Sequence, residues 1–220
     1  EIPMAGTEGG YSYHGESNEN WLKKAWSDVR GNLIMLGEGF LFNIAFYGNS
    51  GKDPTSEAWG YYVEGEKGME ELYPIAVVPS YAAMSFLLEG HKSAGSIEWL
   101  GDTAWGYAYE RGSDIVLAVW DWSGEPREVE IPVGVESVTV YDWMGNASSV
   151  ATPEGVVKLT LTKDPTYIRG AAPALWSAAA TKALSFTQTQ LEVHPGDPLS
   201  FGLTVNASGE LTIKGNTALG

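Results

Sequence analysis

Cysteine is missing from this sequence, and histidine is rare. Because none of the 220 residues is a cysteine, the chain can form no disulfide and no zinc–thiolate site, and thiolate catalysis is excluded. The histidines, His14, His91 and His194, are too widely spaced for a local metal-binding motif. We therefore expect no metal and no cofactor.

Positive charge is also scarce. The chain has 13 Lys and Arg residues against 28 Asp and Glu, which gives a formal net charge of −15 and a pI near 4.5. Such a chain repels nucleic acids and anionic membranes. Long apolar runs that could span a bilayer are absent, and so is the basic-then-apolar pattern of a signal peptide. We expect neutral or cationic partners, and neither nucleic acid nor membrane.

Short apolar-alternating runs fill the region from Ser96 to Gly170, separated by Gly, Pro, Asp and Asn. Asp114–Asp121 is the most apolar of them, and its branched residues suit a central strand. Further strands are expected at residues 103–111, 127–133, 136–143, 148–152, 156–162 and 166–169. The pattern predicts an antiparallel β-sandwich over residues 93–170.

Helices and strands alternate in residues 1–92. Ser17 can cap a helix that runs to about Leu36, with Lys24 and Asp28 off its apolar stripe. A second helix is expected to end at Glu89, with Gly90 as its C-terminal glycine.

Strands are expected on either side of the first helix. The opening residues end in Glu8, and the apolar run Phe40–Tyr47 suits a strand buried on both faces. Residues 48–73 have no clear period and are interpreted as a long loop. Two strands cannot make a stable parallel sheet, so residues 1–92 are interpreted as a piece of something larger.

The end of the chain changes character again. Residues 171–185 form an alanine-rich linker or short helix by this interpretation. Residues 186–220 are predicted to be a C-terminal β segment, with strands at 190–194, 199–205 and 210–214, that either packs on the rest or begins a further sandwich. The fold class is therefore mainly β with an α/β N-terminal part.

Aromatic residues are plentiful, with nine Trp and eleven Tyr. Their rings can stack on sugars, but they also fill β-sandwich cores. Most tryptophans of the middle region are expected in the sandwich core or at its joint with the N-terminal part: Trp99, Trp105, Trp120, Trp122 and Trp143. Asp121 and Asp142 flank turns and are expected to bond local backbone NH groups.

Several motifs stand in a familiar order. The strand end Thr7-Glu8-Gly9, the run 40–47 and the helix 73–90 precede Tyr141-Asp-Trp-Met-Gly-Asn146 and Pro165-Thr-Tyr-Ile-Arg-Gly170. This order resembles the C-terminal part of a clan A glycoside hydrolase, in which a (β/α)₈ barrel is followed by an antiparallel β-sandwich. The resemblance covers residues 1–170 and implies the last strands and helix of the barrel.

The resemblance implies a catalytic role for Glu8, since the seventh barrel strand of that clan presents a glutamate nucleophile. A retaining glycosidase needs such a carboxylate together with a second, protonated one. Neighbouring residues would bind sugar or hold the carboxylate: Tyr11, Tyr13, His14, Tyr47 and Trp59. It also implies a secreted protein that acts on a polysaccharide or oligosaccharide.

This sequence departs from the family pattern in three ways. The acid/base glutamate and six barrel strands have no counterpart here, so a missing N-terminal barrel segment or another chain is expected to supply them. Tyr47 stands where the clan often has a Trp. The chain is thus interpreted as a fragment of an O-glycosyl hydrolase, whose own activity the sequence leaves open.

Two other interpretations stay open. One is a non-catalytic β-sandwich module for carbohydrate binding or assembly, in which Glu8 is a structural acid. The other is a surface-layer or filament protein, favoured by the acidity and the successive β segments.

Overall fold

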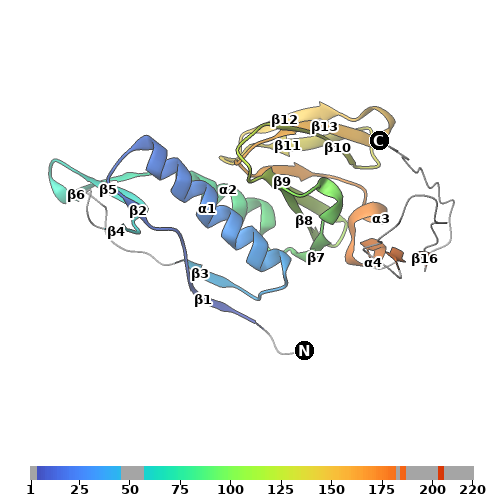
Figure 1. The fold of residues 1–220 in the computed structure, drawn as a ribbon, viewed down its shortest axis with the longest axis horizontal. Coiled ribbons are helices and arrows are strands. Elements are labelled where there is room, and N and C mark those ends of the chain that lie inside the picture. Colours follow the sequence, from blue (N-terminus) through green and yellow to red (C-terminus); the bar gives the residue numbers. More distant parts are fainter. Residues whose placement is uncertain (1–3, 46–56, 182–183, 187–202, 206–220) are drawn as a thin grey trace, which may run out of the picture.

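The computed structural model describes residues 4–45, 57–181, 184–186 and 203–205 (Figure 1). A long helix, α1, lies between a short parallel strand pair and an antiparallel β-sandwich. None of the helices in these ranges is long and apolar enough to cross a membrane. The fold is mainly β with an α/β N-terminal part, as the sequence predicts.

The N-terminal part begins with a β-α-β unit. Strand β1 (Gly6–Gly9) pairs in parallel with β3 (Asn43–Ala45), and α1 (Asn18–Gly37) connects them. The predicted cap is confirmed, because the Ser17 hydroxyl accepts a hydrogen bond from the Asn20 backbone NH at 3.1 Å.

The expectation of a loop over residues 48–73 is wrong for its described part. Residues 57–74 contain short strands, β4 (Glu57–Ala58), β5 (Tyr62–Gly65) and β6 (Gly68–Pro74), and β5 and β6 form an antiparallel hairpin. Its alternating runs are brief and rich in acids, so no period stood out in the sequence. The hairpin leads into α2 (Val77–Leu88), after which Gly90 adopts a φ of 72°, as expected of a C-terminal glycine.

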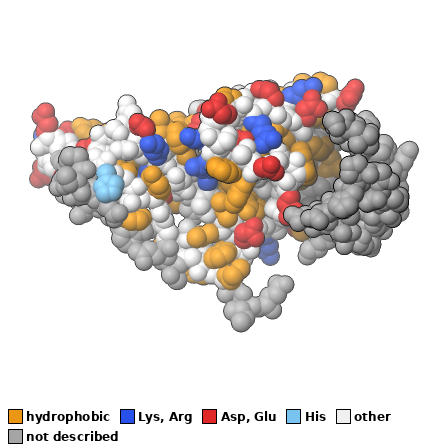
Figure 2. All heavy atoms as spheres, viewed as in Figure 1, with side chains coloured by type: hydrophobic (Ala, Val, Ile, Leu, Met, Phe, Trp, Pro, Cys, Tyr) orange, Lys and Arg blue, Asp and Glu red, His pale blue; other side chains and the backbone are white. Residues whose placement is uncertain are grey.

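The run from residue 40 was expected to be buried on both faces, and its described part is exposed instead. Leu41, Phe42 and Ile44 are 66%, 48% and 53% exposed, and Met4 before β1 is 50% exposed. Figure 2 shows hydrophobic side chains gathered at the lower edge of this face, over β1 and β3. The reason is that β1 and β3 form a sheet of only two strands, which cannot cover its own apolar face.

The sandwich has a six-stranded sheet in the order β12-β11-β14-β9-β8-β7 and a second layer made by β10 and β13. The bounds of these eight strands match the strands predicted from the sequence closely, except that β7 was not predicted. The strands are β7 (Lys92–Ser96), β8 (Ala104–Arg111), β9 (Asp114–Asp121), β10 (Arg127–Pro132), β11 (Ser137–Tyr141), β12 (Ala147–Ala151), β13 (Val156–Leu161) and β14 (Thr166–Arg169). Short 3₁₀ turns, η1 (Glu98–Leu100) and η2 (Pro153–Gly155), lie between them.

Both faces of the six-stranded sheet are covered at its central strands. One face packs against β10 and β13 around residues such as Ile131 and Ile168. The other packs against α1 and α2, so Leu33 of α1 lies in one cluster with Tyr109 and Trp120 of the sheet. A shared hydrophobic cluster therefore joins the N-terminal part to the sandwich.

Of the two expectations for residues 171–185, a linker or a short helix, the structure shows short helices, and part of this segment packs into the sandwich. Helix α3 (Pro173–Trp176) places Trp176 in the core at 6% exposure, and its indole NH donates to the Pro132 carbonyl at 2.7 Å. Helix α4 (Ala178–Thr181) follows. Alanine-rich composition is typical of linkers, but it also lets a chain lie close against a sheet.

The C-terminal β segment is described only in part. Strand β15 (Leu184–Phe186) pairs with β16 (Leu203–Val205), which falls within the predicted strand at 199–205. The predicted strands at 190–194 and 210–214 lie outside the described residues.

The two turn aspartates behave as expected. Asp142 accepts hydrogen bonds from the backbone NH groups of Met144 and Asn146, both at 2.9 Å. Asp121 accepts from the Ser123 backbone NH at 2.8 Å. Local bonds of this kind fix the turns that join the strands.

The expectation that the tryptophans are core residues holds only in part. Trp120 is buried, and Trp143 packs against a cluster beside α2. Trp105 and Trp122 lie at the expected joint, where they line a hollow between α1 and the sheet, but they are 41% and 54% exposed rather than buried; Trp99 is 54% exposed. Trp99 lies in the 3₁₀ turn η1, outside the strands of the sheet, and α1 covers Trp105 and Trp122 only in part.

Candidate active site

Glu8 lies near the C-terminal end of β1, in the parallel pair with β3. The register shifts between Gly6 and Gly9, so a bulge or irregularity of the strand falls on Thr7 and Glu8. Bulges of this kind are over-represented beside active sites. The C-terminal ends of parallel strands are also where (β/α) barrels place their catalytic groups.

The loop after Glu8 is anchored to α1 by a buried ion pair. Lys24 Nζ lies 2.8 Å from Asp28 Oδ2, and neither side chain is exposed to solvent. Tyr11 bonds both partners through its backbone, donating its NH to Asp28 Oδ1 at 2.5 Å and accepting from Lys24 Nζ at 2.9 Å. The ion pair therefore fixes the path of the chain three residues beyond Glu8.

Burial dominates the electrostatics of this pair. It raises the pKa of Asp28 above the ordinary value, although Lys24 and the backbone NH of Tyr11 oppose the rise. Lys24 Nζ also lies 4.9 Å from the centroid of the Tyr61 ring, which gives the ammonium a cation–π contact.

Polar contacts continue from the ion pair to β3. The Asn32 amide donates to the Asp28 carbonyl at 2.8 Å and to the Tyr81 hydroxyl. Asn43 of β3 donates to Asn32 Oδ1 at 2.9 Å. The Asn43 side chain lies so close to β1 that a Cβ on Gly6 would collide with it, so only glycine fits there. This chain of contacts ties both parallel strands to α1.

The residues predicted to bind substrate differ in their exposure to solvent. Tyr11 is 41% exposed, whereas Tyr13 is 3% exposed and packs in a hydrophobic cluster with Ala25 and Ile75. Pairing of β2 (Tyr13–His14) with β4 brings His14, which is exposed, beside the segment that leads to Trp59. Tyr47 lies outside the described residues. The buried position of Tyr13 favours a packing role for this residue.

Lys24 and Asp28 are the site residues that the sequence analysis missed, since both were placed off the apolar stripe of the helix. The signal was present in their spacing, because opposite charges four residues apart on a helix can pair. Their burial depends on the loop that follows Glu8, which helical periodicity does not report.

Comparison with solved structures reveals similarity in fold. A family 39 glycoside hydrolase from Bacteroides cellulosilyticus WH2 matches 76% of this chain and 34% of its own, with a TM-score of 0.59 and 15% identity. The chain shares its fold with glycoside hydrolases. A family 30 subfamily 8 xylanase from Clostridium acetobutylicum matches 77% of this chain and 43% of its own, with a TM-score of 0.54 and 12% identity.

A conserved exported protein from Bacteroides fragilis is also similar, over 76% of this chain and 39% of its own, with a TM-score of 0.56 and 14% identity. No family model and no curated protein matches the sequence. The chain spans less than half the length of each of these three structures. The resemblance to the C-terminal part of a clan A glycoside hydrolase is confirmed at the level of fold.

Proposed function

We propose that this chain is the C-terminal portion of a retaining glycoside hydrolase that cleaves O-glycosidic bonds in a polysaccharide or oligosaccharide. Glu8 is its nucleophile, and the acid/base carboxylic acid comes from outside this chain. The observation that carries the proposal is the position of Glu8 at the irregular C-terminal end of β1, within a parallel β-α-β unit of glycoside hydrolase fold.

The chemistry follows from that position. The Glu8 carboxylate attacks the anomeric carbon while the partner acid protonates the departing glycosidic oxygen, and a covalent glycosyl-enzyme forms. The same partner then takes a proton from water, which attacks the anomeric carbon and releases Glu8. This sequence of steps needs the two carboxyl groups about 5 Å apart, a distance that converging strand ends of a barrel provide.

The exposed apolar residues of the N-terminal part support the existence of further barrel strands. Met4, Leu41, Phe42 and Ile44 lie on or beside the two-stranded sheet, and each is at least 48% exposed. An apolar patch of this kind marks a surface that another element covers. In our proposal the remaining barrel strands pack here and close the sheet.

Two further aspects of the proposal rest on the names of similar proteins. Xylan is the first substrate to test, since one similar structure is a xylanase. An extracellular location is supported by the similar protein described as exported.

A mechanism-based 2-deoxy-2-fluoro glycoside tests the role of Glu8 in the longest natural polypeptide that contains this chain. The fluorine slows hydrolysis of the glycosyl-enzyme, so mass spectrometry should find the adduct on the peptide that contains Glu8. Glu8→Gln should lower kcat by about 10⁴-fold or more, because it removes the attacking group.

Glu16→Gln is the matched control, since Glu16 is an exposed carboxylate a short distance along the same chain segment. It should leave kcat unchanged. An adduct on a different carboxylate, or full activity of the Glu8→Gln variant, would contradict the assignment.

The alternative of a non-catalytic carbohydrate-binding module is favoured by one observation, the exposure of Trp105 and Trp122 on the sandwich. If the longest natural polypeptide binds glycans and hydrolyses none, this alternative replaces the first.

A further inference from the structure

The sheet face that packs against α1 carries a row of aromatic side chains that continues past the part covered by the helix. Trp105 of β8 and Trp120 of β9 are register partners, with ring centroids 6.4 Å apart. Trp120 is 2% exposed, whereas Trp105 is 41% and Trp122 is 54% exposed. Large aromatic surface left open to water on one face indicates a binding role.

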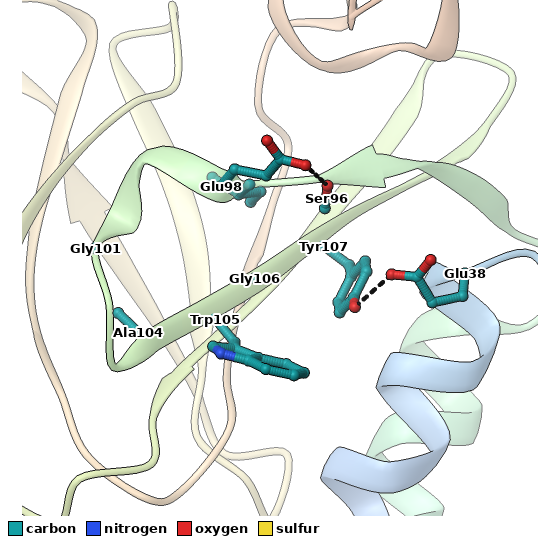
Figure 3. Close-up of a pocket in the computed structure, with 9 residues that line it drawn as sticks. Glu38, Ser96, Glu98, Gly101, Ala104, Trp105, Gly106 and Tyr107 are labelled. Carbon is teal, nitrogen blue, oxygen red and sulfur yellow. Dashed lines mark hydrogen bonds between the residues drawn. The ribbon is translucent and has the colours of Figure 1, made fainter. Parts of the chain in front are cut away.

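Trp105 borders two hollows in the surface. The first has a volume of about 280 Å³ and lies where the end of α1 meets β7 and β8; Figure 3 shows its lining, which includes Glu38, Ser96, Glu98, Trp105 and Tyr107. The second, of about 430 Å³, lies between α1 and the sheet and is lined by Ser27, Arg30, Gly31, Ile34, Trp105, Trp120 and Trp122. We call the two together the Trp105 groove.

Polar groups reach the first hollow from two elements. Glu38, just after α1, accepts a hydrogen bond from the Tyr107 hydroxyl at 2.8 Å. Glu98 of η1 accepts one from the Ser96 hydroxyl at 3.2 Å. A carboxylate has about four acceptor positions, so both retain capacity for further donors. Both side chains are exposed, and so can meet a ligand.

The positively charged side chain of Arg30 lines the second hollow and is held in place there. The Arg30 Nε–H donates to the Trp26 carbonyl at 3.1 Å, which orients the guanidinium. Burial lowers the pKa of Arg30, against the opposing influence of Asp164. Apolar walls with a few convergent polar groups are typical of small-molecule sites.

We propose that the Trp105 groove binds a neutral oligosaccharide chain. Pyranose rings have apolar C–H faces that suit the open faces of Trp105 and Trp122, and sugar hydroxyls donate to Glu38 and Glu98. An acidic polysaccharide is disfavoured, because Glu38, Glu98 and the net charge of −15 repel it more than the single guanidinium of Arg30 attracts it. The groove is built from α1 and the sandwich and includes no part of β1, so this site goes beyond the proposed function of Glu8.

Isothermal titration calorimetry on the purified protein tests the proposal, with xylohexaose and cellohexaose as neutral probes and polygalacturonate as the anionic one. At least one neutral hexasaccharide should bind, and polygalacturonate should not. Trp105→Ala and Trp122→Ala should each weaken binding by about tenfold or more, as loss of a central aromatic contact does. Trp105→Phe, which keeps an aromatic face, should retain most of the affinity.

Trp99→Ala is the matched control. Trp99 is 54% exposed, but it does not line the groove and lies beside Trp176 instead, with ring centroids 6.4 Å apart. It should leave affinity within about twofold of the parent. Thermal unfolding of each variant confirms that it is folded.

Glu8→Gln separates this site from the proposed catalytic one. It should leave hexasaccharide binding to the groove unchanged even where it abolishes hydrolysis. The proposal is overturned if neither neutral hexasaccharide binds, if Trp105→Ala binds as the parent does, if Trp99→Ala weakens binding equally, or if polygalacturonate binds more tightly than both neutral probes.

Discussion

The sandwich and the β1-α1-β3 unit differ in what covers their apolar residues. In the sandwich, the six-stranded sheet is covered on both faces, and Ile131, Val157 and Ile168 are 0% exposed. In the β1-α1-β3 unit, the helix packs well on one side, yet Leu41 and Ile44 of the strand region are more than half exposed.

Both regions must remove apolar side chains from water, and they do so by different means. The sandwich closes on itself because its own β10–β13 pair and α3 supply the second layer. The β1-α1-β3 unit buries its helix against the sandwich and leaves apolar residues of its strands exposed, where we propose that another element packs. Stability should therefore be lost most where buried residues of α1 are changed, at the ion pair and at the joint with the sandwich, and least on the open strands.

The largest loss is expected from Lys24→Met. This change leaves Asp28 buried without its cation, and it removes the donor to the Tyr11 carbonyl. Breaking a buried pair in this way costs about 3–5 kcal/mol in the free energy of unfolding. Urea denaturation followed by far-UV circular dichroism measures it. Lys23→Met should leave the midpoint unchanged, because the pair of Lys23 with Glu19 is exposed; an equal loss in both variants would contradict the role of the buried pair.

Leu33→Ala tests whether the two regions unfold together. Leu33 is 0% exposed at the joint between α1 and the sheet. Its truncation to alanine should lower the free energy of unfolding by about 2–5 kcal/mol. Since the cluster also contains Trp120, tryptophan fluorescence and far-UV circular dichroism should shift to the same lower midpoint. A fluorescence transition that stays at the parent midpoint would show that the sandwich is stable without the helix.

Asp121→Asn changes a residue of the sandwich alone. It should lower the free energy of unfolding by about 1.5–3 kcal/mol near neutral pH. Burial raises the pKa of Asp121, but hydrogen bonds from Ser123 and Thr103 and the charge of Arg127 lower it by more, so the net pKa lies below the ordinary 3.8. The stabilisation is therefore present above pH 3.8 and is lost as the pH falls through the folded-state pKa.

The test of this pH dependence is urea denaturation at neutral pH and at about pH 3. The difference between Asp121→Asn and the parent should shrink at the acidic pH. Asp102→Asn, an exposed change on the neighbouring loop, is the control and should show little effect at either pH. A difference that is independent of pH would contradict a role for the ionised carboxylate.

The smallest effect is expected from Leu41→Ser. Because Leu41 is 66% exposed here, the change should alter the free energy of unfolding of this chain by less than about 0.5 kcal/mol. In a longer polypeptide that completes the barrel, loss of the buried side chain should cost about 1.5–3 kcal/mol. Equal small effects in both proteins would argue against barrel strands packing on β3.

The sequence predicted most elements whose signals are local. The Ser17 cap, the end of α2 before Gly90 and the strands of the sandwich all depend on spacing or turn chemistry within a few residues. It did not predict the β5–β6 hairpin or the packing of Trp176, because brief alternation and alanine-rich composition resemble loops and linkers. The assignment of Glu8 came from resemblance to a family and remains a proposal.

By itself, then, the sequence determined which residues share a face, since periodicity and turn residues are properties of neighbouring positions along the chain. Tertiary structure decided which of those faces are covered. It buried Lys24 and Asp28 beneath the loop after Glu8, and it left Trp105 open beside the end of α1. The physical reason is that the burial of a residue depends on elements that are distant in sequence. A local sequence pattern does not show which of these elements packs on a given face.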